Sequence, residues 1–283
     1  MEQFEAQLSN AALAPATVVN YLADLRAFLR WCEETDGARC TPFSLDEQDI
    51  QAYCTFLEEI KGNTPATINR RIQTLRKFYD LAIAAGQTHA NPAEGVSLLR
   101  EPASGRSRSL SADDVERLLI AVRRGSSRWA TRDWVIIQML LGAGLKLSEL
   151  TELRLDDVDL EADEPCLHIR GTGGDPERTV PLEPEVREAL ETYLPTRKSA
   201  PGVSNVCVNR DGNPLSTRSI QRLLRHYGRA AGLSGLTTQA LRYVYARKVY
   251  EQSGDLKTVA SLLGHRHLAT TIRYLRPSSE SRD

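Results

Sequence analysis

The sequence predicts a mainly α-helical protein: an all-helical N-terminal part, then a mostly helical C-terminal part with a small antiparallel β-sheet. Three observations predict this fold class. Apolar residues recur at the three- and four-residue intervals of amphipathic helices over most of the 283 residues. Strand-like runs occur only between residues 166 and 209. Residues 100–111, "REPASGRSRSLS", combine Pro, Gly and Ser without apolar periodicity, so we expect domains at 1–99 and 112–283 joined by this linker.

Length and composition fit a soluble globular protein. The chain is long enough for two domains with their own cores, and 41% of its residues are hydrophobic and 26% charged. No apolar run approaches the roughly 18–20 residues that span a bilayer, and the N-terminus lacks the basic and apolar blocks of a signal peptide. The five cysteines form no CxxC pair, which argues against a zinc site or a disulfide framework. We therefore expect a cytoplasmic protein with no metal site and no membrane association.

Two amphipathic segments open the N-terminal part. Residues 15–34, "PATVVNYLADLRAFLRWCEE", keep their apolar side chains on one helical face. Residues 44–62, "SLDEQDIQAYCTFLEEIKG", begin with Ser44 and Glu47 at the spacing of a capping box and close on a glycine. Both segments are therefore predicted to be helices.

A third helix is predicted over residues 64–86, because both of its ends are marked. Thr64 is followed by Pro65, the residue favoured at the first helical position, and Gly86 closes the segment. The first hundred residues carry 9 Lys or Arg against 13 Asp or Glu, yet this helix has a basic side. That side consists of Arg70, Arg71, Arg76 and Lys77.

The C-terminal part mixes helices with short strands. Ser111 and Asp114 are spaced to cap a helix, and residues 132–144, "RDWVIIQMLLGAG", predict a buried one. Residues 166–182, "CLHIRGTGGDPERTVPL", predict a β-hairpin around a Gly/Asp/Pro turn. A helix is expected at 186–194, a third strand in "NVCVN" at 205–209, and further helices from Ser216, Thr238, Leu256 and His267.

Charge within this second part is unevenly distributed. Residues 216–276 contain 11 Lys or Arg and only 2 acidic residues, a balance of +9, although the whole chain has a net charge of −1. Such a stretch favours a phosphate-binding face, and a solvated basic surface is an equal alternative on charge alone.

Several polar residues of the second part need a reason. Lys146 in "GAGLKLSEL" is a cation at a predicted helix start, where the helix dipole disfavours positive charge. Gln239 and Arg242 in "TTQALRYVYA" lie three residues apart and share a helix face. His265 stands nine residues before Tyr274. Taken singly, each residue fits an ordinary structural role, and no local spacing identifies a nucleophile.

Taken together and in order, these segments resemble the motifs of the tyrosine recombinase (phage integrase) family. "GAGLKLSEL" is similar to its Gly-Leu-Arg-x-Ser-Glu segment, and "IRGTGGDPERTVPL" to a hairpin with Gly-Lys-Gly followed by Arg-x-Val-Pro-Leu. "TTQALRYVYA" resembles His-x-Leu-Arg-His, and "LLGH" with "TTIRYL" resembles the ending that carries the nucleophile. The resemblance implies a helical core-binding domain, a basic linker and a catalytic domain.

The resemblance also implies a chemistry. In this family a tyrosine attacks a DNA phosphodiester and forms a 3′-phosphotyrosyl bond, with no metal or nucleotide cofactor, so the protein supplies all the charge stabilisation. By motif, Tyr274 is the nucleophile position, Arg242 a phosphate clamp and His265 a hydrogen-bonding partner near the phosphate.

Three further positions depart from the family pattern. Lys146 stands in place of the first arginine, Gln239 in place of the first histidine, and Thr172 in place of the hairpin lysine. Lysine keeps the charge but loses the two-pronged geometry of arginine, and glutamine donates a hydrogen bond but carries no proton. A threonine hydroxyl does not serve as a general acid near neutral pH, so these substitutions predict slow cleavage.

The expected partner is double-stranded DNA, and self-association or a second recombinase remains open. DNA contacts are expected from Arg70, Arg71, Arg76, Lys77, Arg106, Arg108, Arg178, Arg218 and Arg222. The favoured hypothesis is a DNA-binding protein of recombinase type that clamps duplex DNA and whose strand cleavage is weakened or lost. The alternative is an active recombinase or integrase, and a helical interaction module unrelated to DNA is the least favoured reading.

Overall fold

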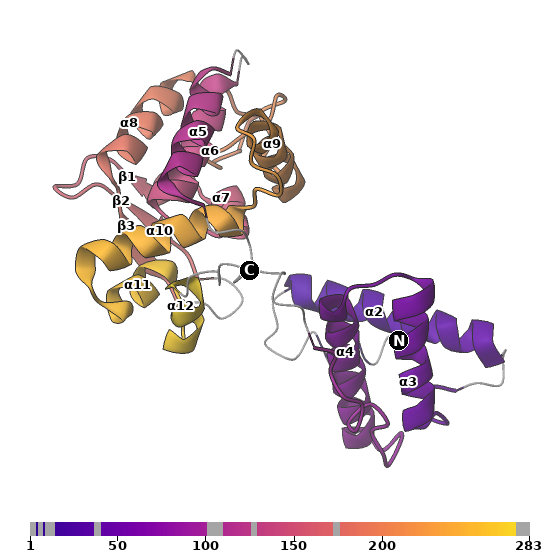
Figure 1. Ribbon diagram of the computed structural model, residues 1–283. Coiled ribbons are helices and arrows are strands. Elements are labelled where there is room, and N and C mark those ends of the chain that lie inside the picture. The colour runs from indigo at the N-terminus through magenta and orange to yellow at the C-terminus, as the bar shows by residue number, and fades with distance from the viewer. Residues whose placement is uncertain are drawn as a thin grey trace. The chain divides into compact units, whose positions relative to one another are not determined.

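The chain divides into two compact units, residues 1–105 and 106–283 (Figure 1). The computed structural model describes residues 4, 8, 15–36, 41–100, 110–125, 129–171 and 176–275. The expected linker at 100–111 contains the division between the units, and most of it, including Arg106 and Arg108, lies outside the described residues.

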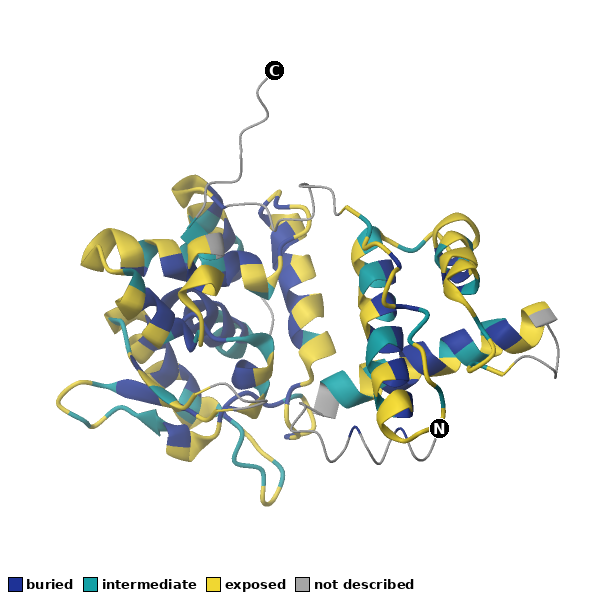
Figure 2. Cartoon of the chain, turned by 90° about the horizontal axis from the view of Figure 1, so that it is seen from below, coloured by how far each residue is buried: buried dark blue, intermediate teal, exposed yellow. Residues whose placement is uncertain are grey.

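The described helices of the first unit are those that the sequence predicts. They are α2 (Pro15–Asp36), α3 (Glu47–Thr55), which continues into a π-helical turn (Phe56–Ile60), and α4 (Pro65–Ala84). Their buried faces meet in one core that includes Phe28, Tyr53 and Tyr79. Figure 2 shows this pattern as buried stripes on the facing sides of the helices.

The start of α4 is as predicted, and the start of α3 is not. The Thr64 hydroxyl accepts the Thr67 amide, and Pro65 is the first helical residue. The expected capping box of Ser44 and Glu47 is wrong, because the helix begins two residues later. Asp46 accepts the amides of Gln48 and Asp49 at 2.8 and 3.1 Å, and the Asp49 carboxylate accepts the Asp46 amide at 2.9 Å. A carboxylate pair at the same spacing thus takes the role assigned to the hydroxyl.

The second unit contains a largely buried helix, α6. The α-helices of this unit are α5 (Ala112–Arg123), α6 (Ala130–Gly142), α7 (Leu147–Glu152), α8 (Pro184–Tyr193), α9 (Thr217–Ala230), α10 (Thr238–Ser253), α11 (Leu256–Leu263) and α12 (Leu268–Leu275). In α6 every residue from Val135 to Gly142 is buried, as the apolar run predicts. The capping box of Ser111 and Asp114 at the start of α5 is also confirmed.

The predicted hairpin is confirmed, and the predicted third strand is wrong. β2 (Cys166–Ile169) and β3 (Arg178–Pro181) pair antiparallel, and β1 (Val158–Asp159) completes the sheet in the order β1-β2-β3. Residues 205–209 instead form two isolated bridges to different partners, residues 154 and 214. Residues 206–208 are buried and apolar, as in a strand, but the backbone groups of the segment bond to loops on two sides.

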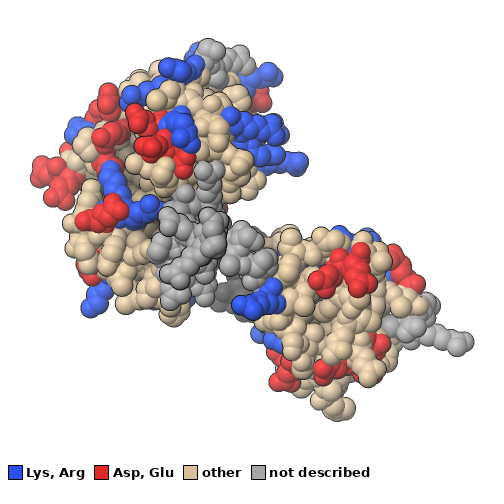
Figure 3. Space-filling view, viewed as in Figure 1, with Lys and Arg blue, Asp and Glu red and all other residues tan. Residues whose placement is uncertain are grey.

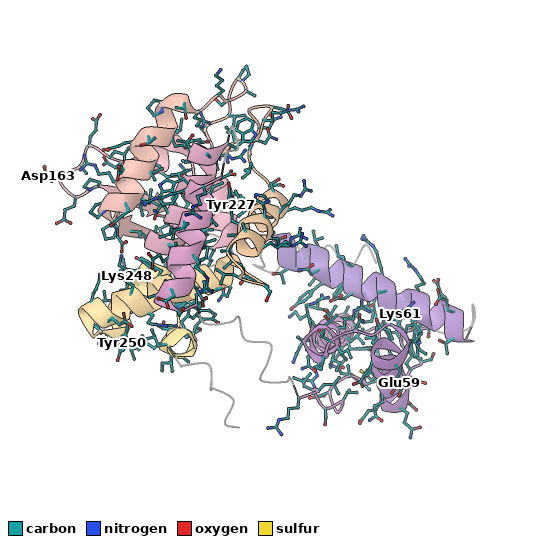
Figure 4. The ribbon with its side chains drawn as sticks, turned by 45° about the horizontal axis from the view of Figure 1, so that its top comes forward. Glu59, Lys61, Asp163, Tyr227, Lys248 and Tyr250 are labelled. Atoms are coloured by element: carbon teal, nitrogen blue, oxygen red, sulfur yellow. The ribbon has the colours of Figure 1, made fainter. Side chains whose placement is uncertain are left out.

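Helix α9 has a basic solvent-exposed face and an inner face that is hydrogen-bonded to the core of the unit. Its N-cap Ser216 accepts the Ser219 amide, and Arg218 and Arg222 are exposed. Figure 3 shows basic side chains gathered over α9, whereas acidic ones gather over α8 and the connection between β1 and β2. Tyr227 points from α9 into the unit, where its hydroxyl donates to Asp133 of α6 at 3.0 Å (Figure 4). None of the described helices of either unit is both long and apolar enough to cross a membrane.

Candidate active site

Helix α10 presents Gln239 and Arg242 on one face at its N-terminal end. Thr237 caps the helix by accepting the Ala240 amide at 3.1 Å, which fixes the first turn. Gln239 is exposed, whereas Arg242 is only 1% exposed and is among the largest fully buried side chains. The i, i+3 relation predicted from the sequence therefore joins a surface amide to an interior cation.

The turn between α11 and α12 carries His265. Gly264 ends α11 in the left-handed conformation at φ +67°, and the His265 amide donates back to Ala260 at 2.9 Å. The His265 ring is half-buried, and its Nδ1 lies 3.0 Å from the Thr271 hydroxyl on α12. This hydrogen bond to α12 thus fixes the orientation of the His265 ring.

Tyr274, on α12, meets the residues that the resemblance assigns to the same site. Gln239 Nε2 donates to the Tyr274 hydroxyl at 2.7 Å. The Tyr274 ring centroid lies 4.8 Å from that of His265 and 4.4 Å from that of Tyr243. Arg242 lies over the same ring, with its Cζ 5.9 Å from the centroid. Residues far apart in the sequence therefore form one cluster.

The Arg242 guanidinium is bonded to backbone carbonyls, and one of its N–H donors has no acceptor among the described residues. Its Nη1 donates to the Gly144 carbonyl, its Nη2 donates to the Leu263 carbonyl, and Nη2 also lies 3.4 Å from His265 Nε2. Its buried Nε–H has no acceptor among the residues that the structure describes. Burial lowers the pKa of Arg242, and the charges of Tyr274 and Glu149 oppose that shift. A buried donor without a partner is rare in a folded protein and sets Arg242 apart from the other described arginines of the unit.

Glu149, which sequence reasoning did not select, supplies the buried negative charge of the cluster. Its Oε2 accepts the Lys146 amide at 2.7 Å and lies 3.8 Å from Arg242 Nη1. Both of its oxygens accept Arg178 at 2.8 Å. Burial by itself raises the pKa of Glu149, but the hydrogen bonds and charge of Arg178, the Lys146 amide and the charge of Arg242 hold it below the ordinary value. Glu149 stands three residues after Lys146, at capping-box spacing, which is a local signal for its bond to the Lys146 amide but not for its contacts with the two arginines.

Lys146 occupies the N-cap of α7 and is half-buried. Its segment is joined to Arg242 in two ways: through the Gly144 carbonyl two residues earlier and through Glu149 three residues later. Thr172, the hairpin position, lies outside the described residues. The described residues contain no group of three or more His, Cys, Asp or Glu side chains arranged to hold a metal ion.

The residues expected to contact DNA have different surroundings. In the first unit, Arg70 pairs with Asp24, Arg71 Nη1 lies 3.3 Å from the Tyr53 hydroxyl, and Lys77 is half-buried. Arg76 donates to three backbone carbonyls between residues 93 and 96, at 2.8 to 3.1 Å, so its guanidinium is engaged within the unit.

In the second unit, Arg218 and Arg222 are exposed four residues apart on α9. Arg178 is different, because its side chain is 5% exposed and bonded inside the unit to Glu149. The pattern of basic residues in the sequence did not distinguish these two environments.

Comparison with known families accounts for both units. The phage integrase family profile matches residues 108–281, and the profile of the phage integrase N-terminal SAM-like domain matches residues 1–86. The tyrosine recombinase XerC of Proteus mirabilis is 34% identical over 268 residues, covering 93% of this chain and 83% of that protein. The tyrosine recombinase XerD of Lacticaseibacillus casei is 30% identical over 275 residues, covering 95% of this chain and 90% of that protein.

Solved structures share the fold at lower identity. A lambda integrase(75-356) dimer bound to a COC′ core site aligns with a TM-score of 0.77 at 21% identity, covering 100% of this chain and 96% of that one. The Tn1549 transposon integrase in complex with a circular intermediate DNA aligns with a TM-score of 0.76 at 20% identity, covering 96% of this chain and 93% of that one. The mainly helical fold with its small antiparallel sheet is therefore a known architecture.

Proposed function

The chain belongs to the phage integrase family of tyrosine recombinases, and from that premise we propose that it binds duplex DNA and cleaves one strand with Tyr274 at a reduced rate. The observation that carries the proposal is the cluster at Tyr274, where Gln239 donates to the hydroxyl and Arg242 and His265 lie beside the ring. The family relation argues against the reading as an interaction module unrelated to DNA.

The proposed step is an in-line displacement at phosphorus. The Tyr274 oxygen forms a bond to phosphorus while the bond from phosphorus to O5′ breaks, leaving a 3′-phosphotyrosyl linkage and a free 5′-hydroxyl. Gln239 Nε2 donates to that oxygen at 2.7 Å, which stabilises the phenolate that forms when the phenol loses its proton. The guanidinium of Arg242, which lies over the Tyr274 ring, supplies positive charge for the phosphate.

Proton transfer is the weak part of this site. Threonine at 172 and glutamine at 239 have no titratable group near neutral pH, so neither takes the phenol proton nor protonates O5′, and another group or water does so. A missing general acid lowers the rate by ~10²–10⁴, and loss of a charge-stabilising contact lowers it by ~10²–10³. Lys146 keeps one positive charge but not the bidentate geometry of arginine.

Duplex binding rests on the basic exterior of α9. Arg218 and Arg222 are exposed, one turn apart, within a helix whose outer face gathers positive charge (Figure 3). Binding that neutralises phosphates releases counterions, so the affinity falls steeply with salt. Self-association on DNA is included in the proposal, since the lambda integrase structure that shares this fold is a DNA-bound dimer.

A nicked suicide substrate, in which the 5′-hydroxyl fragment diffuses away after cleavage, tests the proposal. Native protein is expected to form a covalent protein–DNA adduct that Tyr274→Phe abolishes. Tyr243→Phe is the matched control, because its ring lies beside Tyr274 but has no assigned role in the attack. No adduct with native protein, together with intact salt-dependent binding, would instead support a protein that binds DNA without cleaving it.

A second experiment tests whether the substitutions weaken cleavage. The combined variant Lys146→Arg, Thr172→Lys and Gln239→His is expected to form adduct faster than native protein, by about 10²-fold or more if the lysine acts as the acid. An unchanged rate would contradict the assignment of these three positions.

A further inference from the structure

Arg178 is a buried arginine with every nitrogen engaged inside the protein. It begins β3, and its side chain is 5% exposed. Its Nη1 and Nη2 donate to the two oxygens of Glu149, each at 2.8 Å, and its Nε donates to the Leu262 carbonyl at 2.8 Å. One guanidinium thus joins the base of the hairpin to α7 and to the end of α11.

The end of α11 depends on two arginines. The last four carbonyls of a helix lack partners within it, and in α11 the backbone turn satisfies only the first two, at Ala260 and Ser261. Arg178 takes the Leu262 carbonyl, and Arg242 takes the Leu263 carbonyl. Two cations at a helix C-terminus also match its dipole.

Arg178 also occupies the space directly against Gly264. A Cβ on Gly264 would lie 2.9 Å from Arg178 Nη1 and 3.3 Å from its Cδ. Because Glu149 holds the end of that guanidinium, the arginine does not move aside easily. The next residue is His265, whose Nε2 lies 3.4 Å from Arg242. The position of Arg178 therefore sets where the chain enters the site.

The same guanidinium orders the other side of the cluster. Glu149, fixed by its two bonds to Arg178, accepts the Lys146 amide at 2.7 Å and balances the charge of Arg242 at 3.8 Å. The positions of the Lys146 backbone, through Glu149, and of the turn at His265, through Leu262 and Gly264, thus both depend on the Arg178 side chain.

We propose that Arg178 is a positioning residue for strand cleavage, locking Glu149 and the turn at His265 in register with the hairpin, and that it does not contact DNA. The inference rests on the proposed function of the cluster. It replaces the sequence-based expectation that Arg178 binds a phosphate, since its guanidinium is bonded inside the unit. A displacement of about 1 Å at such a site lowers a rate ~10²-fold.

The test compares Arg178→Lys with Arg132→Lys. Arg132 also donates to one carboxylate, that of Asp133, and to one backbone carbonyl, that of Val208. Both variants are expected to lower the melting temperature. Only Arg178→Lys is expected to lower single-turnover cleavage, about 10²-fold at saturating DNA, with the Kd for DNA within about threefold of native. Equal cleavage by both variants at equal folded fraction would reduce Arg178 to a structural residue, and a weaker Kd with an unchanged saturated rate would make it a DNA contact.

A second measurement tests the positioning role of Arg178 even if native protein forms no adduct with DNA. Backbone amide NMR of Arg178→Lys is expected to show shifted signals for Lys146 and His265, whereas Arg132→Lys leaves both unchanged. Unshifted signals in Arg178→Lys would overturn the positioning role whether or not the protein cleaves DNA. Shifted signals without any adduct would retain that role and reject only the proposed cleavage.

Discussion

Gly144→Ala is the substitution whose consequence is most directly set by the site's geometry. Gly144 has φ +58°, and its carbonyl accepts Arg242. A Cβ there would lie 2.2 Å from Tyr245 Cδ1 and 2.8 Å from two further atoms of the same ring. Tyr245 is 3% exposed, so its ring lies in the packed interior of the unit.

Two costs combine in this variant. A non-glycine residue in the left-handed region costs ~1–2 kcal/mol, and an extra carbon in a packed interior costs ~1–3 kcal/mol. The sum, about 2–5 kcal/mol, corresponds to a fall in melting temperature of ~4–20 °C at ~2–4 °C per kcal/mol for a domain of this size. Because the same peptide holds Arg242, adduct formation is expected to fall as well.

Thermal denaturation followed by circular dichroism measures the effect, with Gly232→Ala as the control. Gly232 has φ +72°, but a Cβ there meets no described atom within 4 Å, so only the backbone cost of ~1–2 kcal/mol remains. A Gly144 variant no less stable than the Gly232 variant would refute the reasoning, because the clash with Tyr245 would then carry no cost.

Three further outcomes are expected. Glu149→Gln leaves buried guanidinium charge uncompensated and is expected to cost ~3–5 kcal/mol of unfolding free energy. The pKa of Glu149 is lower in the folded protein than in the unfolded chain, so its ionised form stabilises the fold above the unfolded pKa of ~4.3, and this stabilisation is lost as the pH falls. Urea titrations measure the unfolding free energy at each pH. The same pH dependence in native and variant protein would contradict this prediction. Arg222→Ala is expected to weaken duplex binding and to reduce the magnitude of the slope of log K against log salt by ~1. Arg187→Ala on α8 is expected to leave the affinity and the slope unchanged. Identical slopes for the two variants would show that Arg222 of α9 does not contact DNA. Burial raises the pKa of Cys207 to about 12, so a thiol reagent at pH 8 is expected to label it only after unfolding, and rapid labelling of the folded chain would contradict that burial.

Features set by neighbouring residues could be predicted from the sequence. The cap of Ser111 with Asp114 and the helix start at Thr64 and Pro65 depend on residues within three positions of one another. The hairpin pairs residues no more than 15 positions apart around one turn. The cap at Asp46 was missed because several polar residues in that stretch have capping chemistry at similar spacing, and the choice between them depends on where the helix packs.

Features set by packing were not predictable in the same way. Residues 206–208 are buried as in a strand, but the pairing of the segment 205–209 depends on loops brought near by the fold. The buried Glu149 joins Lys146, Arg178 and Arg242, the last of which lies 93 positions after it. The charge pattern alone placed Arg178 on the surface. The convergence on Tyr274 was expected only through family resemblance, because no local spacing joins Gln239 to a residue 35 positions later.

In the proposed reaction the phenolic oxygen of Tyr274 forms a covalent bond to a phosphorus atom of the DNA. The most direct measurement is mass spectrometry of the protein after reaction with the nicked substrate, nuclease trimming and proteolysis. A nucleotide mass on the peptide that contains Tyr274, located at that residue by fragmentation, is the predicted result. A nucleotide carried by Tyr243 or by any other residue, or no modified peptide despite bound DNA, would contradict it.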